Sequence, residues 1–193
     1  MNTIYLDNNA TTNIAPEVLE EMLPYLKEMY GNPSSTHTFG GQLRKRIEEA
    51  RARVAKLLNA ETEEIIFTSC GTESDNTAIM SAVESLPDKK HIITSRVEHP
   101  AVLNFCKHLE RKGRRITFIQ VDKQGRLKLD EFSKAIDDDT ALVSLMYANN
   151  ETGVIFPLTE IGKLLKERGA LFHTDAVQAV GKIPIDLKKL PVD

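Results

Sequence analysis

The chain has 193 residues, of which 41% are hydrophobic and 27% charged, so it is long enough to bury a substantial core. Its 25 basic and 28 acidic residues give a formal net charge of −3, which gives no electrostatic reason to expect nucleic acid or an anionic membrane as a partner. No apolar run approaches the roughly 20 residues that a membrane helix requires. Only two cysteines occur, without metal-ligand spacing, and no secretory signal is visible, so we expect a reduced, cytoplasmic location and no metal site.

Helix-period and strand-like segments alternate along the chain, which predicts an α/β fold with a mostly parallel sheet and helices on both faces. We expect an N-terminal segment over residues 1–15 and one domain over residues 16–193. In chain order, the expected helices cover residues 16–29, 40–58, 72–85, 100–112, 130–136 and 158–168. The expected strands cover residues 64–69, 91–95, 116–121, 141–146 and 170–174.

Two junctions between a strand and the following helix carry polar residues that packing does not explain, and ligands of open α/β sheets bind at such junctions. At residues 69–74, small residues leave unpaired N–H groups at a helix start that suit a phosphate, and Thr72 adds a hydroxyl. The sequence is neither Walker A nor Gly-x-Gly-x-x-Gly, and a Ser/Thr helix cap explains it equally well. At residues 95–100, His99 can stack on an aromatic ligand, move a proton or simply cap the helix.

Two further junctions follow later in the chain. At residues 147–153, two consecutive asparagines form an Asx-turn or supply an amide to a ligand, and the local sequence does not decide between these. At residues 172–178, Asp175 ends a strand, and it needs a partner because burying an unpaired carboxylate is expensive. That partner is a protonated heteroaromatic nitrogen or the N–H groups of the following turn. Together, phosphate donors, a stacking histidine, an amide and an aspartate are what pyridoxal phosphate requires.

Several blocks of the sequence carry a resemblance to a known family. They are Tyr5-Leu6-Asp7-Asn8-Asn9-Ala10-Thr11-Thr12, Gly31-Asn32-Pro33-Ser34-Ser35, Glu98-His99-Pro100-Ala101-Val102, Asn149-Asn150-Glu151-Thr152-Gly153 and His173-Thr174-Asp175-Ala176-Val177-Gln178. In this order they resemble the class V, fold-type I cysteine desulfurases, and residues 67–74 most resemble the nitrogen-fixation subtype.

The resemblance implies a pyridoxal 5'-phosphate site and assigns a role to each of six residues. The implied roles are phosphate binding by Gly71 and Thr72, ring stacking and proton transfer by His99, contacts to the ring hydroxyl side by Asn150 and Gln178, and pairing with the ring nitrogen by Asp175. It also implies a homodimer that takes sulfur from L-cysteine, leaves alanine, and passes an enzyme persulfide to an iron–sulfur scaffold protein.

The sequence departs from the family pattern at two points. The family's Schiff-base lysine lies in a Ser-x-His-Lys stretch, and no His-Lys pair occurs in this sequence. Neither Cys70 nor Cys106 matches the persulfide cysteine of the family, and we expect both to be small buried thiols. We therefore expect residues 16–193 to form a cofactor-binding large domain that is truncated at its C-terminal end and inactive alone.

Two alternatives to a cysteine desulfurase remain open. The first is another class V enzyme, such as a selenocysteine lyase or an aminotransferase, although residues 7–12 and 31–35 favour the desulfurase. The second is a non-catalytic remnant that only binds cofactor or pairs with a full-length subunit, which the absence of the lysine favours.

Overall fold

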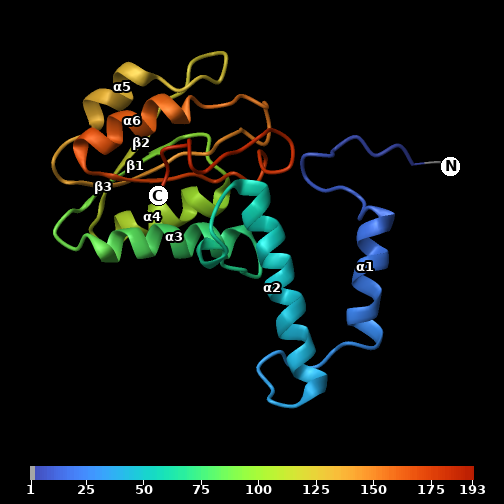
Figure 1. The fold of residues 1–193 in the computed structure, drawn as a ribbon. Coiled ribbons are helices and arrows are strands. Elements are labelled where there is room, and N and C mark those ends of the chain that lie inside the picture. Colours follow the sequence, from blue (N-terminus) through green and yellow to red (C-terminus); the bar gives the residue numbers. More distant parts are fainter. Residues whose placement is uncertain (1–2) are drawn as a thin grey trace. The chain divides into compact units, whose positions relative to one another are not determined.

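The computed structural model describes residues 3–193, which divide into two compact units, residues 3–66 and residues 67–193 (Figure 1). The division expected from the sequence, into an N-terminal segment over residues 1–15 and a cofactor-binding domain over residues 16–193, stays a prediction. Among residues 3–193, no helix combines the length and the apolar character needed to cross a bilayer.

The first unit contains α1 (Pro16–Lys27), α2 (Thr38–Leu58) and a short 3-10 turn, η1 (Thr62–Glu64). Pro16 begins α1 at a position where its missing N–H costs nothing. The ring of His37 caps α2 by accepting a hydrogen bond from the Gly40 N–H at 3.2 Å. Asn59 ends α2 in the left-handed conformation, with φ of 55°. No residue of α1 is buried, so its apolar face is open to solvent.

The second unit is built on a four-stranded sheet in which every pairing is parallel, as expected. The strands are β1 (His91–Ser95), β2 (Arg115–Ile119), β3 (Thr140–Ser144) and β4 (Leu171–His173), in the spatial order β2-β1-β3-β4. The helices are α3 (Gly71–Ser85), α4 (Pro100–Arg111), α5 (Leu129–Ala135) and α6 (Leu158–Arg168).

Helices cover both faces of this sheet, which confirms the expected architecture (Figure 1). Successive side chains of a strand point to opposite faces, so each strand contributes to two cores. Ile92 and Leu142 pack with α3 and α4, whereas Ile93 and Val143 pack with α5 and α6. Because the faces are covered, the ligand-accessible part of the sheet is its edge at the strand ends.

The expected strand over residues 64–69 is wrong. Glu64 belongs to η1, and residues 65–68 have no regular structure. A strand needs a neighbour to satisfy its backbone groups, and no strand within residues 3–193 pairs with this segment. Ile66 is accordingly 80% exposed instead of buried. The bounds of the other expected helices and strands agree with the structure to within two residues.

Candidate functional site

The fourth junction, which follows β4, contacts both the first and the third junction. A Cβ atom built on Gly71, the first residue of α3, would lie 3.3 Å from Cγ2 of Val177, so the start of α3 packs against the turn after β4. The backbone N–H of Tyr147 donates to the carbonyl oxygen of Asp175 at 2.8 Å, which joins the ends of β3 and β4.

The second junction is tied to the third through Asn149. The Nδ2 atom of this buried side chain donates to the carbonyl oxygen of Val97 at 3.0 Å. Its Oδ1 atom accepts from the N–H groups of Glu151 and Thr152 at 3.0 and 2.8 Å. Asn149 thus forms the Asx-turn that the sequence left open. Asn150 is half-buried and donates only a local hydrogen bond, to Glu151 at 2.9 Å.

The start of α3 keeps the features of an anion site. Its N-cap residue, Cys70, makes no side-chain capping hydrogen bond, and Gly71 and Thr72 are exposed. The one carboxylate of the first turn, Glu73, accepts hydrogen bonds from the Ser69 hydroxyl and N–H at 2.5 and 2.7 Å. The N–H groups and the positive end of the helix dipole at Gly71 and Thr72 therefore suit a phosphate.

The two cysteines differ, although both were expected to be buried. Cys106 is buried on α4, and burial raises the pKa of its thiol to about 12. Cys70 is exposed, so the expectation is wrong for this residue. The reason is that Cys70 is the N-cap residue of α3, at the exposed start of the helix. The backbone N–H of Glu73 and the Ser69 hydroxyl lower the pKa of the Cys70 thiol.

His99 and Asp175 both make the local contacts that the sequence allowed as alternatives. The Nδ1 atom of His99 caps α4 by accepting from the Ala101 N–H at 3.1 Å, and the residue is exposed. The Oδ1 atom of Asp175 accepts from the Val177 N–H at 3.0 Å. The cap uses only Nδ1 of His99, and the turn contact uses only Oδ1 of Asp175. The rest of each side chain can therefore still contact a ligand. Gln178, in the same turn as Asp175, accepts from Lys182.

The chain matches the family model described as aminotransferase class-V over residues 4–193. It belongs to this family. It is 60% identical over 193 residues to the cysteine desulfurase of Trichormus azollae, a match that covers all of this chain and 48% of that protein. It is 53% identical over 189 residues to the cysteine desulfurase NifS of Azotobacter vinelandii, covering 97% of this chain and 47% of that protein.

Solved structures agree with the class-V assignment. A NifS-like protein superposes with a TM-score of 0.95 at 46% identity, covering 98% of this chain and 53% of that one. The structure of SspA in complex with cysteine gives a TM-score of 0.94 at 36% identity, covering 99% and 55%. The sheet and its helices are thus part of the fold-type I architecture. This class-V chain spans about half the length of the curated relatives it matches.

Sequence analysis missed Glu98, a buried carboxyl group beside His99 in this class-V chain. Glu98 is 4% exposed, and its Oε1 atom accepts from the Ser95 hydroxyl at 2.6 Å and from the Met146 N–H at 3.1 Å. Its Oε2 atom is buried and has no hydrogen-bond partner within residues 3–193. Burial is the main cause that raises the pKa of Glu98 to about 8, so the carboxyl is protonated at neutral pH.

Asp75, in the second turn of α3, was missed as well. It is 5% exposed, and its Oδ1 atom lies 3.6 Å from Nε2 of His173. This contact is not an ion pair, because burial lowers the pKa of His173 to about 4 and leaves the imidazole neutral. The Nδ1 atom of His173 is hydrogen-bonded to the Ser144 hydroxyl at 2.9 Å. Asp75, Ile79 and Val83 recur every four residues on the buried face of α3. This helical spacing is the sequence signal that could have predicted the burial of Asp75.

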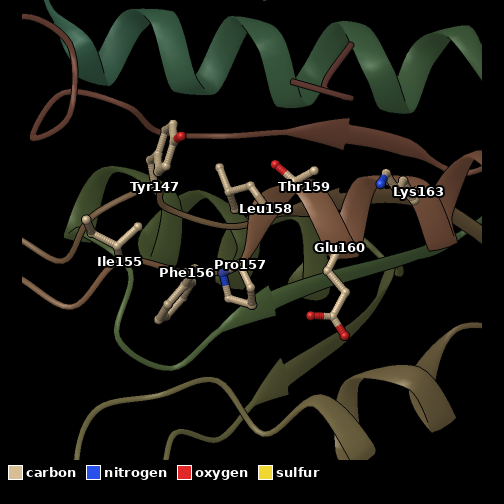
Figure 2. A pocket seen from close by; sticks show the side chains of 8 residues that line it. All are labelled: Tyr147, Ile155, Phe156, Pro157, Leu158, Thr159, Glu160 and Lys163. Atoms are coloured by element: carbon tan, nitrogen blue, oxygen red, sulfur yellow. The ribbon is translucent and has the colours of Figure 1, made fainter. Parts of the chain in front are cut away.

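A hollow of about 540 Å³ lies at the start of α6, and Figure 2 shows the residues that line it. They come from the segment after β3, the segment before α6 and the first turns of α6: Tyr147, Ile155, Phe156, Pro157, Leu158, Thr159, Glu160 and Lys163. Phe156 and Leu158 belong to the core on the α5 and α6 face of the sheet. None of the six residues predicted to bind cofactor lines this hollow, which shares only Tyr147 with the four junctions.

Proposed function

We propose that the protein containing this chain is a pyridoxal-phosphate-dependent cysteine desulfurase. In the proposed reaction, an enzyme thiol takes the sulfur of L-cysteine, so that the C–S bond breaks, an S–S bond forms and alanine is left. The observation that supports the proposal is the contact between Gly71, at the start of α3, and Val177, in the turn that follows Asp175. The desulfurases that match the whole chain at up to 60% identity support the same reaction.

The residues of the junctions fit pyridoxal phosphate. Its phosphate requires N–H and hydroxyl donors, which Gly71 and Thr72 offer at the exposed start of α3. Its ring nitrogen requires a carboxylate, which Asp175 offers in a half-buried position. The hydroxyl oxygen of Thr174 is buried without a partner within residues 3–193, so an unused polar atom lies beside Asp175. When bound, the cofactor supplies a protonated ring that accepts an electron pair from the substrate α-carbon.

The residues of this chain then have separate tasks. Asp175 holds the proton on the ring nitrogen, because a carboxylate at contact distance favours the charged form. His99 stacks on the ring and moves a proton at the substrate, while its Nδ1 atom remains bound to the Ala101 N–H. Asn150 and Gln178 orient the ring from its hydroxyl side.

The proposal includes a homodimer, L-cysteine as substrate, an iron–sulfur scaffold protein as sulfur acceptor and a location in the cytoplasm. The reaction also requires a lysine in a Ser-x-His-Lys stretch and a thiol that matches the family's persulfide cysteine. Since this sequence has no His-Lys pair, we propose that the 193-residue chain is inactive by itself.

The test is sulfide production from L-cysteine, with a thiol reductant and saturating pyridoxal phosphate, by the full-length protein and by the 193-residue chain. We expect equal amounts of sulfide and alanine from the former and none above a free-cofactor control from the latter. In the full-length protein, Asp175→Asn keeps the capping oxygen but removes the charge, so turnover should fall roughly 10²-fold or more with a much smaller change in KM.

The matched control is Asp88→Asn, which removes one carboxylate at an exposed position after the far end of α3 and should leave turnover unchanged. Bound cofactor is measured from its absorbance in every variant. Near-wild-type turnover of Asp175→Asn with cofactor bound would contradict the role of Asp175. Turnover of L-selenocysteine but not L-cysteine, or transfer of the amino group to a 2-oxo acid, would favour the other class-V activities. Cofactor binding without any turnover by the full-length protein would favour the non-catalytic remnant.

A further inference from the structure

We propose that Asp75 is a positioning residue of the ring-nitrogen site: it holds a proton while Asp175 lacks a cationic partner, and it releases that proton to solvent when a cationic ring binds Asp175. The inference rests on the proposed function only for the identity of the cation, a pyridinium ring. The coupling between the two carboxyl groups belongs to this chain and is testable without cofactor.

Within residues 3–193, no lysine or arginine forms an ion pair with Asp75. It is 5% exposed on the inner face of α3, and the group facing it from β4 is the imidazole of His173, at 3.6 Å. That imidazole is neutral at neutral pH, because burial lowers its pKa to about 4. A buried carboxyl without a cationic partner is more stable when protonated.

Two further carboxyl groups interact electrostatically with Asp75, and one of them, Asp175, lies two residues after the contacting His173. Asp175 follows β4, and the start of α3 packs against its turn through the contact between Gly71 and Val177. Burial and then the charge of Asp175 raise the pKa of Asp75 to about 7. Glu98, at the junction before α4, is protonated at neutral pH, since burial raises its pKa to about 8. After burial, the charge of Asp175 is thus the second cause of the raised pKa of Asp75.

A cation bound at Asp175 changes this balance. It neutralises the carboxylate and removes the repulsion that disfavours ionised Asp75, so the Asp75 proton becomes easier to lose. The newly ionised Asp75 adds a second negative charge near the cation and strengthens its binding. By linkage, binding and proton release depend on each other, so cation affinity should rise with pH through the range in which free Asp75 titrates.

The first experiment follows the carboxyl carbon of Asp75 by NMR in the 193-residue chain between pH 4 and 9. We expect Asp175→Asn, which keeps the capping oxygen, to lower the Asp75 pKa by about one unit from its value of about 7. The pKa should remain above that of a free aspartate, because burial is the larger cause. The control Glu84→Gln removes an exposed carboxylate about 14 Å away along α3, beyond the Debye length, and should leave the Asp75 pKa unchanged.

The second experiment measures proton release with a pH-indicator dye when pyridoxal phosphate is added at pH 6, where about nine-tenths of the free Asp75 carboxyls carry a proton. Asp75→Asn imitates the protonated side chain and cannot ionise. It should bind the cofactor with fewer protons released, by up to about 0.9 per bound molecule, than the wild-type chain.

The outcomes separate this inference from the proposed function. An Asp75 pKa that is unchanged in Asp175→Asn, or that shifts equally in Glu84→Gln, overturns the coupling. Cofactor binding with equal proton release by the wild type and Asp75→Asn overturns the inference alone. If pyridoxal phosphate does not bind the chain at all, the assignment of the cofactor site falls, and the linkage to the cofactor falls with it.

Discussion

The two cysteines illustrate how position along a helix changes the chemistry of one residue type. Cys70 lies at the N-cap of α3, where a backbone N–H and the Ser69 hydroxyl stabilise its thiolate. Cys106 lies on the buried face of α4, in the core. Because the thiolate is the nucleophile, the two residues should differ widely in reactivity although neither resembles the family's persulfide cysteine.

We predict that iodoacetamide labels Cys70 and spares Cys106 in the native chain. A pKa of about 12 leaves only about one Cys106 thiol in 10⁴ ionised at pH 8, so Cys70 should react about 10³-fold faster or more. Labelling of Cys70 should also begin at lower pH than labelling of a free cysteine, since the pKa of its thiol is lowered. Mass spectrometry of timed samples gives both rates, and rapid native labelling of Cys70→Ser would contradict the prediction.

The sequence allowed us to select candidate site residues that follow a strand, but it did not reveal the two buried carboxyl groups, Glu98 and Asp75. Asp175 and His99 are visible because each follows a strand and precedes a turn or helix. Buried Glu98 accepts a hydrogen bond from the N–H of Met146, which lies 48 residues further along the chain. A contact at that separation leaves no local pattern, so the raised pKa of Glu98 could not be predicted. The cofactor roles themselves stay predictions.

At the scale of elements, the helices were predictable because hydrophobic period and end signals agree. Gly169 ends α6 in the left-handed conformation, with φ of 63°, as a glycine after the last helical residue predicts. The failed strand at residues 64–69 has the opposite cause. Its apolar run is strand-like, but forming a strand depends on a neighbour, and the local sequence does not reveal whether one is present.

Two adjacent glycines near the start of α2 provide a test of packing in the first unit. A Cβ atom on Gly40 would clash with the carbonyl oxygen of Asn32 and lie 2.7 Å from Cβ of Ser35. A Cβ atom on Gly41 would meet nothing within 4 Å. We therefore predict that Gly41→Ala stabilises the unit by about 0.5–1 kcal/mol, through helix propensity. Gly40→Ala should destabilise it by about 1–3 kcal/mol, because a backbone atom has little room to move.

Urea unfolding followed by circular dichroism at 222 nm measures both changes, and each variant is the matched control for the other. Equal stability of the two variants would show that the loop at residues 32–35 yields easily to a methyl group. In that case the close packing of Gly40 against this loop would contribute little to the stability of the first unit.

At the scale of the whole molecule, the buried carboxyls make stability depend on pH. The pKa of Glu98, about 8 when folded, lies above the value of about 4.3 for an unfolded glutamate. The folded state therefore binds the proton more tightly. The resulting stability is fully present below about pH 4.3 and is lost as the pH rises towards 8. Asp75, with a pKa of about 7, acts in the same direction.

We predict that Glu98→Gln weakens this pH dependence. Glutamine is neutral throughout, so between pH 5 and 7.5 the free energy of unfolding should fall less steeply than in the wild type, by up to about 1.4 kcal/mol per pH unit. The measurement is urea unfolding at several pH values. Exposed Glu84→Gln should retain the wild-type slope. A wild-type slope in Glu98→Gln would mean that Glu98 is ionised in the folded protein.

The order β2-β1-β3-β4 also has a consequence for how the chain acquires its fold during synthesis. β1 lies inside the sheet, and all five of its residues are buried, yet one of its neighbours, β3, begins 49 residues later. A ribosome that adds about 5–20 residues per second takes several seconds to make that interval. Throughout this time β1 has at least one edge unpaired, so the nascent chain is open to strand pairing with other chains. Slower folding of distant contacts prolongs the interval. Slower translation of the segment between β1 and β3 should therefore increase aggregation of the nascent chain, although it leaves the folded protein unchanged.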